Sequence, residues 1–142
     1  MQTKYKMMII NPEFVEFIPK ELEERVLYIS MRFRTAVHKC ACGCGNKAVT
    51  RFSPTDWKLI FNGKTVSLYP SIGNWGFPCQ SHYWIKNNKI VWDKKRSKEE
   101  INSIRRQDYL EKKNYYKEEV KTSNNRFIKL IKFIGGLFNG KS

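Results

Sequence analysis

The sequence predicts an α+β protein in which a small antiparallel β-sheet of hairpins with a zinc knuckle is followed by basic C-terminal helices. Three observations lead to this fold class. Alternating apolar and polar runs in the middle of the chain are joined by dipeptides typical of tight turns. Three cysteines lie within the segment CACGC, and a long charged stretch without Pro or Gly follows Ser97.

The 142 residues are expected to form a zinc-stapled β-rich domain over residues 1–97 and a basic helical extension over residues 98–142. A hydrophobic content of 41% is enough for one packed core. In the first part, PKELEERVLYISMRF predicts a short helical turn at its proline and carboxylates. A strand rich in Val, Ile, Tyr and Phe is expected to follow.

The segment DWKLIFNGKTVSLYPS predicts a hairpin with a two-residue turn at Asn62-Gly63. Strand alternation from such a turn pairs Asp56 with Tyr69. It also places Asp56 and Ser71 on one polar face as a diagonal pair, about 7 to 8 Å apart. The opposite face is expected to contact the core and carries Trp57, Leu59, Val66 and Leu68.

A second hairpin is predicted in HYWIKNNKIVW, where Asn87-Asn88 forms the turn. If this turn is also tight, strand alternation pairs His82 with Asp93. Asp93 is therefore a second candidate for the carboxylate that orients His82.

The cysteine cluster predicts a structural zinc site. Zinc takes four nitrogen or sulfur ligands tetrahedrally, and the glycines of HKCACGCG let the backbone fold tightly around an ion. The expected ligands are Cys40, Cys42, Cys44 and Cys79. His38 in place of one cysteine is the alternative, and free buried cysteines are another. Four protein ligands leave no open position for water, so the zinc is expected to stabilise the fold.

Ser71, His82 and Asp56 are the candidate catalytic residues. A Ser-His-Asp triad needs the serine oxygen at one ring nitrogen and the carboxylate at the other, and an imidazole ring bridges the gap expected between Ser71 and Asp56. Backbone N–H groups of the turn at Ile72-Gly73-Asn74, together with the Asn74 amide, are expected to form the oxyanion site.

The same residues also suit purely structural roles. From the residues alone, Ser71 also suits the role of a turn serine, His82 that of a histidine at a strand end and Asp56 that of a capping or turn carboxylate in SPTD. Ser53, Ser67 and Ser81 are rival nucleophiles.

A formal charge of +14 indicates an acidic partner: nucleic acid, an anionic membrane surface or an acidic protein. The N-terminal MQTKYKMMII lacks the apolar core of a signal peptide, and no apolar run approaches the roughly 20 residues that span a bilayer. We therefore expect a cytoplasmic protein. After a break expected at TSNN, RFIKLIKFIGGLF predicts an amphipathic helix that contacts its own domain, a dimer mate or, as the alternative, a membrane surface.

Several segments together resemble the BubE family, which belongs to bacterial ubiquitination-like operons and was formerly a domain of unknown function. They are FVEFIPKELEERVLYIS, HKCACGCG, SPTDWKL, VSLYPSIGNW and PCQSHYWI, and they cover roughly residues 12 to 97. The resemblance implies a serine peptidase with a Ser-His-Asp triad that releases a ubiquitin-like protein from its targets. Residues 1–97 would then be a peptidase-like domain with ubiquitin-like conjugates as partners.

Two functions without catalysis remain open at the level of the sequence. One is a zinc-stapled basic module whose aromatic side chains stack on single-stranded nucleic acid: Tyr69, Trp75, Tyr83, Trp84 and Trp92. The other is an adaptor that recognises the ubiquitin-like protein through its sheet edge. A spread positive charge attracts phosphates without specifying a sequence, so no specific nucleic acid partner is expected.

Overall fold

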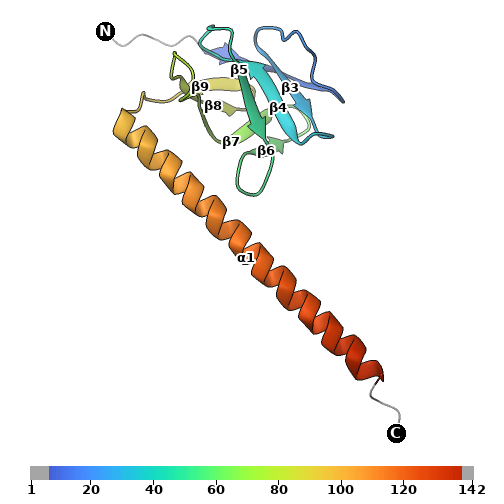
Figure 1. Cartoon of the computed structure of the whole chain (residues 1–142). Helices are drawn as coiled ribbons and strands as arrows, with labels where there is room; N and C mark the ends of the chain where they lie inside the picture. The colour runs from blue at the N-terminus through green and yellow to red at the C-terminus, as the bar shows by residue number, and fades with distance from the viewer. Residues whose placement is uncertain (1–6, 139–142) are drawn as a thin grey trace. The chain divides into compact units, whose positions relative to one another are not determined.

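The computed structural model describes residues 7–138. They divide into two compact units, and the boundary along the chain lies between Ser97 and Lys98. The first unit contains all nine strands of the described part of the chain, and the second contains one long helix (Figure 1). The predicted α+β class is therefore confirmed. Among the described residues, no helix is both long and apolar enough to cross a bilayer.

The first unit is built from two β-sheets rather than one. The five-stranded sheet has the order β1 (Met8–Ile9), β9 (Lys89–Trp92), β8 (His82–Lys86), β7 (Val66–Gly73) and β6 (Lys58–Phe61). The four-stranded sheet has the order β2 (Asn11–Phe14), β3 (Val26–Ser30), β4 (Thr35–Lys39) and β5 (Lys47–Arg51). Neighbouring strands are antiparallel except β2 and β3, which are parallel.

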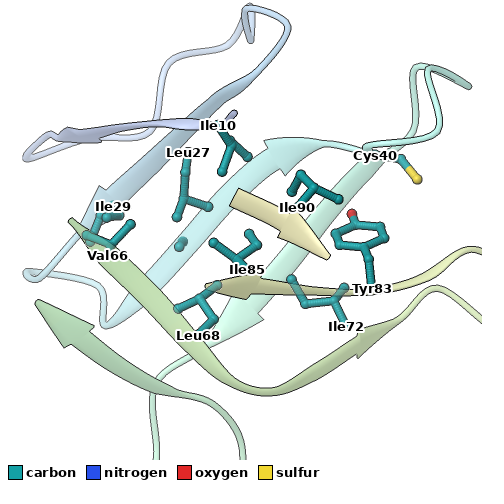
Figure 2. Packing of buried hydrophobic residues seen from close by; sticks show 11 residues of the cluster. Ile10, Leu27, Ile29, Cys40, Val66, Leu68, Ile72, Tyr83, Ile85 and Ile90 are labelled. Atoms are coloured by element: carbon teal, nitrogen blue, oxygen red, sulfur yellow. The ribbon is translucent and has the colours of Figure 1, made fainter. Parts of the chain in front are cut away.

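One hydrophobic core joins the two sheets. Strands β3 and β4 contribute buried apolar side chains from one sheet, and β7, β8 and β9 contribute them from the other (Figure 2). The largest fully buried members are Tyr83, Leu27, Ile29, Leu68 and Ile85. Burial of this apolar surface is the main favourable term in folding the unit.

The first hairpin forms, but its predicted register is wrong. Lys58, not Asp56, pairs with Tyr69, because the Asn62 side chain closes a longer turn. Its Oδ1 accepts hydrogen bonds from the backbone N–H groups of Lys64 and Thr65, at 3.0 and 2.7 Å. The shift is by two residues, and side chains alternate with period two, so the predicted core face is still correct. Val66 and Leu68 are buried, while Leu59 and Trp57 pack against the core.

The second hairpin has the predicted two-residue turn. Lys86 pairs with Lys89, and Asn87 and Asn88 both have positive φ angles, 48° and 63°, as this kind of turn requires. The predicted pairing of His82 with Asp93 also holds, one residue beyond the end of β9, because the Asp93 N–H donates to the His82 carbonyl at 2.9 Å.

Strand β7 continues where a turn was predicted. Ile72 and Gly73 pair with Tyr83 and His82 in β8, so Ser71 lies within a strand. The register between β7 and β8 shifts between Leu68 and Ile72, next to the cis peptide bond that precedes Pro70. Such an irregularity redirects the side chains that follow it.

Two helix predictions need correction. The segment that begins at Pro19 forms turns and bends up to β3, with no helix. The C-terminal part is one helix, α1 (Lys98–Phe138), which continues through TSNN. Those four residues have only modest helix propensities. However, none of them is Pro or Gly, so they do not stop the helix. It begins directly after the predicted N-cap, Ser97.

Candidate active site and metal centre

The structure brings Ser71 and His82 into hydrogen-bond contact. Ser71 Oγ lies 2.8 Å from His82 Nε2, and the two side chains come from the neighbouring strands β7 and β8. His82 is buried and Ser71 is half-buried. The Trp57 indole N–H donates to the Ser71 carbonyl at 3.4 Å and so holds the backbone that carries the hydroxyl.

The other ring nitrogen of His82 faces a backbone carbonyl. His82 Nδ1 lies 3.2 Å from the carbonyl oxygen of Lys94. A carbonyl can only accept, so the Nδ1–H group donates and the neutral ring carries its proton there. Nε2 is then free to accept the hydrogen bond from the Ser71 hydroxyl. This partner of His82 is a main-chain atom, which no residue type in the sequence indicates.

The carboxylate beside His82 belongs to Asp93. Asp93 Oδ2 lies 3.6 Å from His82 Nε2, the same nitrogen that contacts Ser71. The pKa of Asp93 is lowered, first because the Lys94 backbone N–H donates to Oδ1 at 2.8 Å, and also because the Trp84 indole donates to Oδ2 at 3.2 Å. Asp93 is therefore ionised at neutral pH.

Asp56 lies in the SPTD turn, where it has the structural role that was the alternative to catalysis. The Ser53 hydroxyl donates to Asp56 Oδ2 at 2.7 Å, and the Asp56 N–H donates to the Ser53 carbonyl at 3.3 Å. The diagonal pairing of Asp56 with Ser71 depended on the incorrect hairpin register. The second hairpin, whose turn was predicted correctly, instead brings Asp93 close to His82.

Trp75 covers the histidine on one side. Its ring centroid lies 4.9 Å from that of His82, at an interplanar angle of 53°. A Cβ atom added to Gly73 would lie 2.3 Å from the Trp75 ring, so only glycine leaves room for the indole here. Gly73 therefore contributes to the packing around His82. The tryptophan two residues after this glycine in GNWG is the sequence feature that could have indicated the contact.

Asn74, predicted as an oxyanion donor, instead belongs to a buried network. Its backbone N–H donates to the Ser81 carbonyl at 2.9 Å, and its Nδ2 donates to Ser81 Oγ and to the Tyr83 hydroxyl at 2.9 and 3.3 Å. These donors are directed at protein acceptors. Ser81, one of the rival nucleophiles, also contacts Cys40 Sγ at 3.0 Å.

The remaining rival serines also have structural partners. Ser53 donates to Asp56, and Ser67 Oγ accepts from the Asn87 N–H at 2.8 Å, across the sheet. Among the four serines considered, Ser71 alone contacts a histidine ring through a hydrogen bond that the structure shows.

The four cysteines gather as predicted. Their sulfur atoms all lie within 4.8 Å of one another, and no disulfide joins them. Neighbouring sulfurs are 3.4 Å apart for Cys40 and Cys42, 3.9 Å for Cys40 and Cys79, and 3.8 Å for Cys44 and Cys79. A tetrahedron with metal–sulfur distances of about 2.3 Å has edges of about 3.8 Å, so the group fits a metal ion.

The surroundings of the cluster also suit metal ligands. The pKa of Cys44 is lowered to about 6 because the backbone N–H and side-chain amide of Asn46 donate to its sulfur. Burial raises the pKa of Cys40, which is almost fully buried, so a cation would be needed to hold it as a thiolate. Ser81 Oγ accepts from Asn74, so its own proton is directed to Cys40, the kind of outer contact that orients a ligand.

His38 is not part of the cysteine cluster, so the alternative ligand set is wrong. Its Nε2 lies 2.8 Å from the Tyr83 hydroxyl. That hydroxyl accepts from the Asn74 amide and from the Ala41 N–H, and hence gives its proton to His38. Burial lowers the pKa of His38 to about 4, so the ring is neutral.

The aromatic residues considered for nucleic acid do not form one stacking surface. Tyr83 is fully buried and Trp75 packs on His82. Tyr69 and Trp84 contact each other, with ring centroids 5.8 Å apart. Trp92 packs against Tyr83 at 5.4 Å. The structure therefore offers no row of free rings among these five residues.

A serine hydroxyl held by a buried imidazole is the pairing that serine hydrolases use. In agreement with this, residues 14–93 match the family model described as "Bacterial ubiquitination-like system serine protease (BubE)", and the chain belongs to this family. The match confirms the resemblance found in the sequence. Comparisons with curated proteins and with solved structures gave no match.

The Asn74 network generates a prediction about stability. Asn74→Ala leaves Ser81 Oγ and the Tyr83 hydroxyl without their shared donor, and we expect the free energy of unfolding to fall by about 1–3 kcal/mol. Denaturant unfolding measures this, with the exposed Asn11→Ala as control. Unchanged stability with a reduced kcat would instead show that Asn74 acts on the substrate.

Proposed function

We propose that this chain is a serine peptidase that releases a ubiquitin-like protein from its conjugates, with Ser71 as nucleophile and His82 as general base. The single observation that carries the proposal is the 2.8 Å contact between Ser71 Oγ and His82 Nε2, in a chain of a serine protease family. The family's description supports conjugates of a ubiquitin-like protein as the substrate class.

The reaction follows from the tautomer of His82. With Nδ1–H donated to the Lys94 carbonyl, Nε2 accepts the Ser71 proton while Oγ attacks the carbonyl carbon at the C-terminus of the ubiquitin-like protein. A new C–O bond forms, the bond to the target's amine or hydroxyl breaks, and the proton moves from Nε2 to that leaving group. Water then hydrolyses the acyl-enzyme through the same base.

The proposed role of Asp93 is electrostatic. When Nε2 takes the proton, His82 becomes a cation with the ionised Asp93 Oδ2 at 3.6 Å. The attraction stabilises the imidazolium as it forms, at a partly buried position where water screens charges less than in bulk. The Lys94 carbonyl would hold the ring orientation, a task that the carboxylate performs in the usual triad.

The tetrahedral intermediate also needs donors for its oxyanion. Asn74 is engaged elsewhere, as shown by its bonds to Ser81 and Tyr83. The Gly73 backbone remains our candidate from the predicted pair, because Gly73 pairs with His82 in the ladder and lies two residues from Ser71 in the same strand.

We propose that the metal is zinc and that its role is structural. Four thiolates in a tetrahedral arrangement suit Zn²⁺ and leave no ligand position for water or substrate. Cys79 lies on the connection from β7 to β8, so its bond to the metal would hold the segment between Ser71 and His82 against the loop that carries Cys40, Cys42 and Cys44.

The zinc proposal predicts about one zinc ion per chain in purified protein, measured by elemental analysis. Cys79→Ser should lower the metal content, the melting temperature and the activity together, because the segment between Ser71 and His82 is then released. Folded, active protein without metal would contradict the proposal. Loss of activity in a Cys79→Ser variant that keeps its metal and its melting temperature would point to a direct catalytic role for Cys79.

The catalytic proposal is tested by cleavage of a conjugate of the cognate ubiquitin-like protein. Ser71→Ala and His82→Ala should each lower kcat/KM by about 10⁴-fold or more, and the double variant should be little worse, because the two side chains act as one unit. Asp93→Asn should cost about 10- to 100-fold, the loss of one charge-assisted contact.

Asp56→Asn is the matched control for the carboxylate. We expect it to cleave at a nearly unchanged rate, because Asp56 bonds to Ser53 in its own turn. An inactive Asp56→Asn beside a fully active Asp93→Asn would show that the carboxylate was assigned wrongly. Wild-type rates in Ser71→Ala and His82→Ala would refute the proposed activity of this pair.

A further inference from the structure

The last third of α1 carries a dense group of exposed apolar side chains. We call residues 126–137 the basic amphipathic segment. Phe127, Phe133 and Leu137 are 64%, 68% and 67% exposed. Four more apolar residues of the segment are also exposed: Ile128, Leu130, Ile131 and Ile134. Contiguous exposed apolar surface of this kind marks an interaction site.

The helical geometry sorts these side chains onto one side. Residues three, four and seven apart share a face, so Phe127, Leu130, Ile131 and Ile134 form one apolar stripe. Lys129 and Lys132 lie on the other side of the same turns. A helix with lysines on one face and Phe, Ile and Leu on the other matches helices that lie in the membrane interface.

The charge of the segment is of one sign. Arg126, Lys129 and Lys132 are its only charged residues, and none of the chain's 13 acidic residues lies after Glu119. A surface that covers the apolar stripe must therefore carry negative charge where it meets these three basic side chains. The headgroups of an anionic lipid bilayer provide both the negative charge and the apolar layer beneath it.

A second copy of the chain is the competing cover for this segment. A coiled coil needs an apolar seam that repeats every seven residues along the helix. Counted from Phe127, the seam positions within the segment are apolar, but further back along the helix they include Ser123, Lys113 and Arg106. Two copies paired along the segment would also bring together two sets of three positive charges with no acidic residue of the segment to balance them.

The chain's own β-unit is also a poor cover on grounds of charge. Residues 1–97 contain 16 Lys and Arg against 7 Asp and Glu, so this unit repels a basic helix face. We propose that the basic amphipathic segment binds the surface of an anionic lipid bilayer, lying in the interface with its apolar stripe, which includes Phe127 and Ile131, inserted. The β-unit with its proposed peptidase site would then act at the membrane surface.

The test is co-sedimentation of the full chain with vesicles of phosphatidylcholine, with or without a quarter of phosphatidylserine. We expect binding to the anionic vesicles only. Lys129→Gln with Lys132→Gln should weaken binding about thirtyfold, at roughly 1 kcal/mol per basic residue near the surface. Phe127→Ser with Ile131→Ser should also abolish binding, because the inserted area is lost.

The matched control is Lys113→Gln with Lys117→Gln, which removes the same charge from exposed positions of the same helix outside the segment. It should bind nearly as well as the wild type, and circular dichroism should show equal helix content in all variants. Equal weakening by both lysine pairs would mean attraction by net charge alone and would overturn the proposal. So would self-association in solution that Phe127→Ser with Ile131→Ser abolishes, because the apolar stripe would then cover a second copy.

Discussion

The candidate site depends on the antiparallel pairing of β7 with β8. This ladder pairs Gly73 with His82 and brings Ser71 Oγ within 2.8 Å of His82 Nε2, although the residues are eleven positions apart. The irregular register before Ile72 and the absence of a side chain at Gly73 both serve the same contact, since Trp75 can then pack beside the imidazole. The other ring nitrogen of His82 depends on the second ladder, because the Lys94 carbonyl follows β9, which pairs with β8 on its other side.

The cysteine cluster and the candidate catalytic pair share their supporting structure. His82 and Tyr83 are consecutive in β8 and point to opposite faces, one toward Ser71 and the other into the core. Tyr83, Asn74 and Ser81 form a buried hydrogen-bonded network that ends at the sulfur of Cys40. A metal held by the cysteines would therefore fix the connection between the two strands that carry the site. In the proposed enzyme, this arrangement would let a small β-unit hold the two catalytic side chains in place without a large core.

Local signals in the sequence predicted part of this arrangement, and non-local contacts decided the rest. The second hairpin was predictable because two successive asparagines accept the left-handed conformation. The cysteine cluster was predictable because closely spaced cysteines are typical metal ligands. The first hairpin was misjudged because the Asn62 side chain competes with the two-residue turn. That shift preserved the faces of the strands but changed the partner of Tyr69, and with it the inferred carboxylate. The Lys94 carbonyl could not be predicted, since any residue supplies a carbonyl and only the fold decides where it lies.

The central claim is that the hydroxyl of Ser71 is activated by His82, and a fluorophosphonate probe tests it most directly. The probe forms a covalent bond only with a serine oxygen made nucleophilic by its surroundings. Mass spectrometry of the digested, labelled protein should find the adduct on Ser71, and labelling should disappear in both Ser71→Ala and His82→Ala while each variant remains folded. An adduct on Ser53, Ser67 or Ser81, or labelling that persists unchanged in His82→Ala, would contradict the account.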